Sequence, residues 1–167
     1  MQLANRPEDL HATRVALGEA DLVIGCDALV SASPEVLSRL RPDHGRAVVN
    51  SAAAPTAAFL SQPAWRFPGA QAEAAVAAST GGNCDFIDAG PLAEALLGDT
   101  IYANPLLLGY AWQKGGLPLS RDSLRRAIEI NGVSVDKNLA AFELGRQAAY
   151  RGVCLLYTSP SPRDLST

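Results

Sequence analysis

The stretch that decides the fold is DLVIGC, residues 21–26, a short apolar run that ends directly before the turn-forming residue Asp27. Two further runs have the same form, RAVVN at residues 46–50 and DFID at residues 85–88. The runs lack the regular polar alternation of a strand with one exposed face. Such runs are typical of strands that are covered on both faces, as in a parallel sheet.

Helix signals lie between these runs. Ser33 followed by Pro34 predicts a helix start, because a serine side chain can accept a bond from a first-turn amide and proline has no amide to leave unpaired there. Residues 70–78 and 91–97 predict two more helices, and glycines that can end a helix follow both. Residues 1–4 predict the remnant of a further strand. The alternation of strand and helix is the order of a doubly wound α/β layer.

The last third of the sequence predicts helices only. Asn104 and Pro105 predict the start of a helix that runs to about Lys114. Its apolar residues surround the axis, so we expect this helix to be buried. Ser120 and Ser134 predict the starts of two further helices. The predicted fold class is therefore α/β, with a partial doubly wound, mainly parallel sheet followed by a C-terminal helical segment.

Composition excludes several classes of protein. The chain has 167 residues, 48% hydrophobic and 19% charged, which is typical of one globular domain. A net charge of −3 gives no reason to expect nucleic acid or an anionic membrane as a partner. No apolar run approaches the roughly 20 residues that cross a bilayer. Three widely spaced cysteines predict reduced thiols in the cytoplasm, with Cys26 and Cys84 buried and inert.

Polar residues follow all three predicted strands. They are Asp27, Asn50 with the adjacent Ser51, and Asp88. Ligands of open parallel sheets bind at the carboxyl ends of the strands, so these residues could face a substrate, a cofactor or a neighbouring domain. Turn and cap formation alone also explains Asp and Asn at such places, and we weigh this explanation above the first.

Three further candidates lie at the two ends of the predicted buried helix. Asn104, Gln113 and Lys114 are partner-facing candidates. Lys114 could approach an anion, although a cation in the last turn of a helix also complements the helix dipole. The sequence has no Cys-x-x-Cys pair, only two histidines and no glycine-rich phosphate loop. We therefore predict no metal site, assign no catalytic residue and expect this chain to bind no cofactor.

Six stretches together resemble one family. They are RPEDLHATRVALGEADLVIGCD, SPEVLSRLRP, RAVVNSAAAPTAAFL, DFIDAGPLAEALLGD, ANPLLLGYAWQKGGLPLS and RAIEINGVSVDKNLAAFELGR. In this order they resemble the gamma-type module of indolepyruvate ferredoxin oxidoreductase, within the wider 2-oxoacid:ferredoxin oxidoreductases. The resemblance covers about residues 6–149.

The resemblance implies a cytoplasmic enzyme that oxidatively decarboxylates indolepyruvate, or another aryl 2-oxoacid, to an acyl-CoA. CoA is a substrate, and ferredoxin accepts the electrons. Thiamine diphosphate, Mg²⁺ and [4Fe–4S] clusters carry the chemistry in the complete enzyme. The resemblance implies that these groups lie on other modules or subunits, which would be the partners of this chain.

Two features predict a fragment. The family module opens with a strand, a glycine-rich turn and a helix before the region that matches residue 1, and this sequence contains none of them. The tail at residues 154–167 contains prolines that prevent a helix. One interpretation of this tail is a disordered linker. The other is translated sequencing-adapter read-through at the end of a metagenomic reading frame, which the tail resembles. We favour the read-through and expect a partial module at residues 1–153 that is inactive alone.

Two alternatives remain open at this point. One is an independent small-molecule-binding α/β domain that uses the crevice at Asp27, Asn50 and Asp88. The other is a structural subunit that holds its partners together through the apolar helix at residues 104–114. A ligand bound by the isolated chain would favour the binding domain over the fragment.

Overall fold

Three parallel strands form the sheet at the centre of the molecule. The computed structural model describes residues 1–10, 12, 14–52 and 68–152. The strands β1 (Leu22–Gly25), β2 (Arg46–Asn50) and β3 (Cys84–Ile87) lie in the order β1-β2-β3. Both pairings are parallel, so the predicted strands are confirmed to within one residue at each end. Residues 1–4 form no strand, contrary to prediction. The tail from Cys154 lies outside the described residues.

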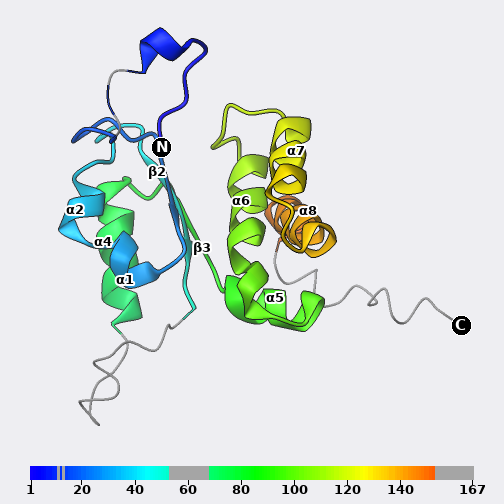
Figure 1. Cartoon of the computed structure of the whole chain (residues 1–167). Helices are drawn as coiled ribbons and strands as arrows, with labels where there is room; N and C mark the ends of the chain where they lie inside the picture. Colours follow the sequence, from blue (N-terminus) through cyan, green and yellow to red (C-terminus); the bar gives the residue numbers. More distant parts are fainter. Residues whose placement is uncertain (11, 13, 53–67, 153–167) are drawn as a thin grey trace, which may run out of the picture.

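Helices cover both faces of this sheet (Figure 1). One face carries α1 (Ala28–Ser31), α2 (Pro34–Leu37) and α4 (Gly69–Ser79). The other face carries α5 (Ala89–Leu97), α6 (Ala103–Gln113) and α8 (Val135–Arg151). A further helix, α7 (Arg121–Asn131), packs against α8. The described residues also form two short 3-10 turns, η1 (Pro7–Asp9) and η2 (Thr100–Tyr102). No helix in the described ranges has both the length and the apolar character needed to cross a membrane.

The central strand shows why the sequence lacks polar alternation. Ala47 and Val49 of β2 belong to the core cluster under α1 and α4, whereas Val48 belongs to the cluster under α5, α6 and α8. Successive side chains of a strand point to opposite faces. Since both faces are covered, the inner positions of β2 are apolar on either face, and its polar residues Arg46 and Asn50 stand at its two ends. The α/β class with a C-terminal helical segment is confirmed.

Several helix ends follow their local signals. Ser33 Oγ accepts the Val36 amide at 3.4 Å and opens α2. Ser120 caps α7 by accepting the amide of Ser123 at 3.1 Å. Gly98, directly after α5, has a φ of 85°, a left-handed conformation that side chains disfavour. These ends depend on residues close in sequence, which is why sequence alone could place them.

One predicted helix start is wrong, and another is confirmed in position without the bond of a serine cap. The helix expected to begin at Asn104 begins at Ala103, because Asp99 Oδ1 accepts the Ile101 amide at 3.0 Å and opens the η2 turn that leads into α6. Asn104 is therefore an exposed residue of the first turn rather than its cap. Ser134 precedes α8 as expected, yet its side chain makes no cap bond and its φ is 42°.

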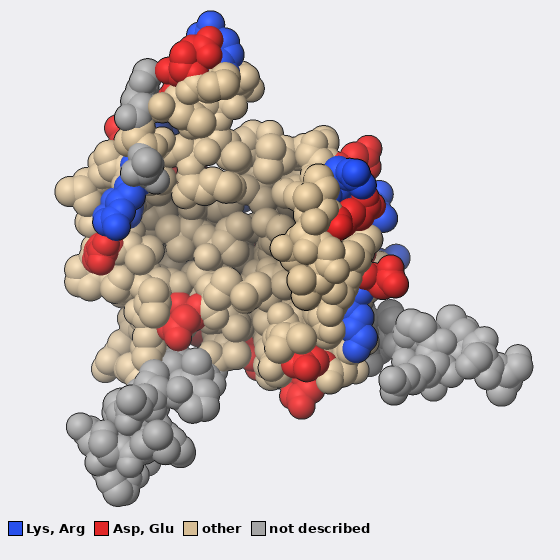
Figure 2. Space-filling view, viewed as in Figure 1, with Lys and Arg blue, Asp and Glu red and all other residues tan. Residues whose placement is uncertain are grey.

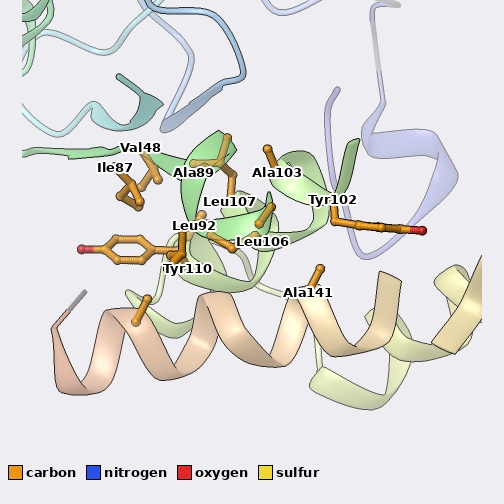
Figure 3. Packing of buried hydrophobic residues seen from close by; sticks show 13 residues of the cluster. Val48, Ile87, Ala89, Leu92, Tyr102, Ala103, Leu106, Leu107, Tyr110 and Ala141 are labelled. Atoms are coloured by element: carbon orange, nitrogen blue, oxygen red, sulfur yellow. The ribbon is translucent and has the colours of Figure 1, made fainter. Parts of the chain in front are cut away.

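The predicted burial of α6 is confirmed, and α8 provides most of its cover (Figure 3). Leu106 and Leu107 are completely buried. A Cβ atom added at Gly109 would lie 1.9 Å from the carbonyl oxygen of Phe142, and one added at Gly145 would lie 1.9 Å from that of Leu106. Glycines on the facing sides of the two helices therefore permit an unusually close backbone approach.

The two helices cross where Gly109 and Gly145 allow the close approach, and side-chain contacts join them on either side of this point (Figure 1). Lys137, near the start of α8, lies over the ring of Tyr102 at the start of α6, 5.4 Å from its centroid. At the other end, Arg146 Nε donates to Gln113 Oε1 at 3.2 Å.

One expectation about the thiols is wrong. Cys26 is exposed and Cys84 is half-buried, whereas both were expected to be buried. Cys26 is the first residue beyond β1 and follows the buried Gly25. The strand positions are covered by helices, but the residue that follows β1 passes beyond that cover, so a single step along the chain changes the environment.

Candidate functional site

Asn50, at the carboxyl end of the central strand, joins the ends of all three strands. Its Nδ2 donates to the carbonyl oxygen of Cys26, after β1, at 3.3 Å. Its Oδ1 accepts the amides of Ala52 at 3.2 Å and of Ala89, after β3, at 3.0 Å. Only a residue of the middle strand has both neighbours within reach. Asn50 is 9% exposed, and its amide group acts as an internal brace.

Asp27 and Asp88 follow the outer strands and have different roles. Asp27 Oδ1 accepts the Val30 amide at 2.9 Å and caps α1, so the cap explanation is confirmed for this residue. Asp88 stands at the cap position of α5 but makes no side-chain cap bond. The first amide of α5 is taken by Asn50 instead. This is one of the amides that no helix can satisfy internally, and here a neighbouring strand supplies its acceptor.

Parallel pairing places the candidates Asp27, Asn50, Ser51 and Asp88 at one edge of the sheet, as the sequence predicted. The Ser51 amide donates to the carbonyl oxygen of Ile87 at 2.9 Å and so extends the pairing of β2 with β3. Residues 53–67, of which 53–60 belong to a stretch of the family resemblance, lie outside the described residues. The described part of the edge is a braced group of strand ends.

A second polar group lies between the sheet and the end of α6. Tyr110 Oη donates to Asp85 Oδ1 at 3.3 Å, and Lys114 Nζ donates to the same oxygen at 3.2 Å. Arg46 Nη1 donates to the carbonyl oxygen of Lys114 at 3.0 Å, and Arg46 Nε donates to Asn83 Oδ1 at 3.3 Å. These bonds tether the end of α6 to β2 and β3. Lys114 therefore forms an ion pair with a carboxylate of the same chain, that of Asp85.

Burial and the charges of this tether favour one protonation state each for Tyr110 and Lys114. Burial raises the pKa of the Tyr110 phenol, and the negative charge of Asp85 raises it further. Burial disfavours the charged form of Lys114, but its hydrogen bond to Asp85 and the nearby charges outweigh this effect, and the pKa of Lys114 is raised. Both shifts keep the phenol neutral and the ammonium charged near neutral pH. Such a pair is suited to holding elements together and poorly suited to proton transfer.

The remaining candidates lie elsewhere. Gln113 contacts α8 through Arg146, and Asn104 is exposed in the first turn of α6. The seven predicted residues are therefore divided among the strand ends, the Asp85 tether and the surface of the helical segment. Within the part of the chain that the structure describes, no three His, Cys, Asp or Glu side chains gather as metal ligands.

A hollow of about 490 Å³ lies beside β1. It is lined by β1 residues, the N-terminal segment and the loop after α6, including Leu22, Ile24, Met1, Leu3, Leu117 and Pro118. The side of the molecule between the sheet layer and the helical segment is largely uncharged (Figure 2). None of the seven predicted residues lines this hollow. No sequence signal predicted it, because its walls come from segments that are far apart along the chain.

Comparison with known proteins identifies the family. The model of the family described as pyruvate ferredoxin/flavodoxin oxidoreductase matches residues 4–148. The matched range contains all three strands, the braced strand ends, the Asp85 tether and most of α8. No curated protein and no solved structure matches the chain. Because the match covers far more than half of its length, the chain belongs to the pyruvate ferredoxin/flavodoxin oxidoreductase family.

Proposed function

We propose that the chain is a supporting module of an oxidoreductase that acts on aryl 2-oxoacids such as indolepyruvate. Family membership supports a 2-oxoacid:ferredoxin oxidoreductase, and the six resembling stretches favour the aryl substrate. In the complete reaction the carboxylate leaves as carbon dioxide, the acyl group passes to CoA, and the released electrons pass to ferredoxin. The isolated chain is inactive in this proposal.

The observation that carries the supporting role is the internal use of the strand-end residues. Asn50 uses both ends of its amide on the backbone of neighbouring strands, and Asp27 caps α1. Polar groups that are engaged in this way hold loops in place. A reacting side chain needs a free atom that faces the substrate, so the arrangement favours a rigid wall over a catalytic centre.

The described residues do not fit the iron–sulfur clusters or the Mg²⁺ ion of the complete enzyme. A [4Fe–4S] cluster takes four thiolates, and Mg²⁺ takes oxygen ligands, often from carboxylates. The described ranges contain only two cysteines, Cys26 and Cys84, and no gathered set of acidic ligands. We therefore assign thiamine diphosphate, Mg²⁺ and the clusters to partner modules, and no chemical step is placed on this chain.

Reconstitution tests this proposal. The chain is combined with the complementary thiamine-binding and cluster-binding modules, and ferredoxin reduction is followed with CoA and either indolepyruvate or pyruvate. We expect no reduction by the chain alone, and a higher kcat/KM for indolepyruvate in the mixture. Ferredoxin reduction by the isolated chain would refute the supporting role, and a preference for pyruvate would refute the aryl substrate.

The hollow beside β1 favours a second candidate function, a small-molecule-binding α/β domain. Its volume of about 490 Å³ is within the range of ligand pockets. Calorimetric titration of the isolated chain with indole-3-lactate, which resembles the substrate but cannot be decarboxylated, tests this candidate. Saturable binding that Leu117→Trp abolishes would favour it, because that substitution fills the hollow from its loop side. Absence of binding up to millimolar ligand would contradict it.

A further inference from the structure

Three arginines of the helical segment converge on one carboxylate. Arg121 of α7 donates to Glu143 Oε1 through Nη2 at 2.8 Å and through Nε at 3.0 Å. Arg125, one turn later, donates to the same oxygen at 3.2 Å. Arg146 of α8 donates to the other carboxylate oxygen. We call Arg121, Arg125 and Arg146 with Glu143 the guanidinium cluster.

The carboxylate at the centre of the cluster is ionised near neutral pH. Burial disfavours its charged form, but the hydrogen bonds and positive charges of Arg121 and Arg146 outweigh burial and lower the pKa of Glu143. A single negative charge thus faces three guanidinium groups. Three guanidinium groups carry more positive charge than one carboxylate balances, so the cluster keeps an excess of positive charge.

One arginine of the cluster is held especially firmly. The Arg146 guanidinium lies over the ring of Trp112, 4.9 Å from its centroid. Its Nε donates to Gln113 Oε1 at 3.2 Å, and its Nη1 donates to Glu143. Stacking and two hydrogen bonds fix the plane of this group before any partner arrives. Preorganised donors of this kind lose little conformational freedom when they bind.

The cluster retains donors and charge that the fold does not use. Each guanidinium carries five N–H groups, and Glu143 and Gln113 accept only a few of them. Asp122, the residue after Arg121, makes no ion pair within 4.0 Å among the described residues. Even if its negative charge is added to that of Glu143, the three arginines leave the cluster positive. The side chains of Arg121 and Arg125 are 46% and 34% exposed. A second anion can therefore reach them and reduce their mutual repulsion.

We propose that the guanidinium cluster docks an acidic segment of a partner protein. The donors are spread over two helices, with Arg121 and Arg125 one turn apart and Arg146 on the neighbouring helix, which suits a chain that presents more than one carboxylate. Arginine matches carboxylates through paired N–H groups, and arginine clusters recognise acidic motifs in this way. This docking does not depend on which 2-oxoacid the complete enzyme uses.

Fluorescence anisotropy with the full chain tests the docking. The probe is a fluorescein-labelled hexaglutamate peptide, titrated at low and at high salt. Arg125→Gln removes a positive charge inside the cluster. Arg126→Gln is the matched control, since Arg126 is the next residue of α7, pairs with Glu129 at 3.0 Å and is 70% exposed. We expect Arg125→Gln to weaken binding roughly tenfold, as for the loss of a charge-assisted hydrogen bond, and Arg126→Gln less than twofold.

The outcomes separate docking from general attraction. Equal weakening by both variants would show attraction by net charge alone and would overturn the proposal. Displacement of the peptide by an equal concentration of inorganic phosphate would do the same, because the site would then be one for small anions. If Arg125→Gln fails to fold, as judged by circular dichroism, Arg125→Lys replaces it. That variant keeps the charge but loses the planar fork, and unchanged affinity would contradict recognition by guanidinium geometry.

Discussion

Replacing Asn50 by alanine removes the brace between the three strand ends. The substitution deletes the donor to the Cys26 carbonyl and the acceptor of the Ala52 and Ala89 amides, at 3.3, 3.2 and 3.0 Å. Alanine keeps the backbone of β2 in place, since the strand pairing uses main-chain atoms only. The variant therefore isolates the contribution of the side-chain amide.

The magnitude follows from these three bonds. An internal hydrogen bond contributes about 1 kcal/mol net, so their loss costs about 3 kcal/mol. The bond to the Ala89 amide is buried, and leaving that donor without a partner adds to the cost, whereas the half-buried Ala52 amide can turn to water. Because a typical domain is stable by roughly 5–15 kcal/mol, Asn50→Ala is expected to remove a large part of the stability.

Urea unfolding followed by circular dichroism measures this loss, with Asn83→Ala as the control. Asn83 is exposed, and its side-chain oxygen accepts one bond from Arg46 at 3.3 Å. We expect Asn83→Ala to change the free energy of unfolding by no more than about 0.5 kcal/mol. Hydrogen exchange adds a local measure, since the Ala89 amide should lose protection in Asn50→Ala.

Two results would refute the brace. The first is a free energy of unfolding for Asn50→Ala within about 1 kcal/mol of that for Asn83→Ala, because three bonds cannot contribute so little if they hold the strand ends. The second is unchanged exchange protection of the Ala89 amide. That result would mean that the first turn of α5 is held by other contacts.

Three further predictions concern the helical segment and its tether. Gly109→Ala should destabilise the fold by about 2 kcal/mol in urea unfolding, since the new Cβ would lie 1.9 Å from a main-chain oxygen of α8. The control Gly90→Ala, whose new Cβ has its nearest contact at 3.6 Å, should change stability by less than about 0.5 kcal/mol. Equal effects of the two variants would contradict the close approach of α6 and α8. Glu143→Gln should cost about 1–2 kcal/mol at neutral pH. Because the folded pKa of Glu143 is lowered, its contribution is complete above the ordinary carboxyl value and lost as pH falls through the folded value, so the difference from wild type should shrink in acid, and a constant difference would refute this. Asp85→Asn should lower the pKa of Tyr110, because the charge of Asp85 is one cause that raises it; an unchanged ultraviolet titration of the phenols would contradict the tether.

The candidate site shows which contacts local sequence signals can predict and which they cannot. The sequence placed Asp27, Asn50, Ser51 and Asp88 at one edge, because parallel strands share their direction. It favoured caps and turns over contact with a ligand or partner, and a cap is confirmed for Asp27 but not for Asp88, which makes no cap bond. Asn50 supplies the missing acceptor for α5 from another strand. A bond between residues 39 apart in the sequence leaves no local pattern to read.

The thiols and the guanidinium cluster show the same limit. Cysteine is usually buried, but the cover over β1 ends at Gly25, so Cys26 is exposed. Glu143 and Arg146 lie one turn apart on α8, and this pair could be expected from their spacing. Their meeting with Arg121 depends on how α7 packs against α8, which the spacing of residues does not specify.

The sequence by itself determined the α/β class, the three strands, the burial of α6 and the ends at Ser33, Gly98 and Ser120. Apolar runs without alternation require two covered faces, and caps and left-handed glycines act on residues within one turn. Tertiary structure alone decided the brace at Asn50, the Asp85 tether, the hollow beside β1 and the guanidinium cluster. Each of these joins segments that are distant in the chain, and only the packing of whole elements brings such groups within bonding distance.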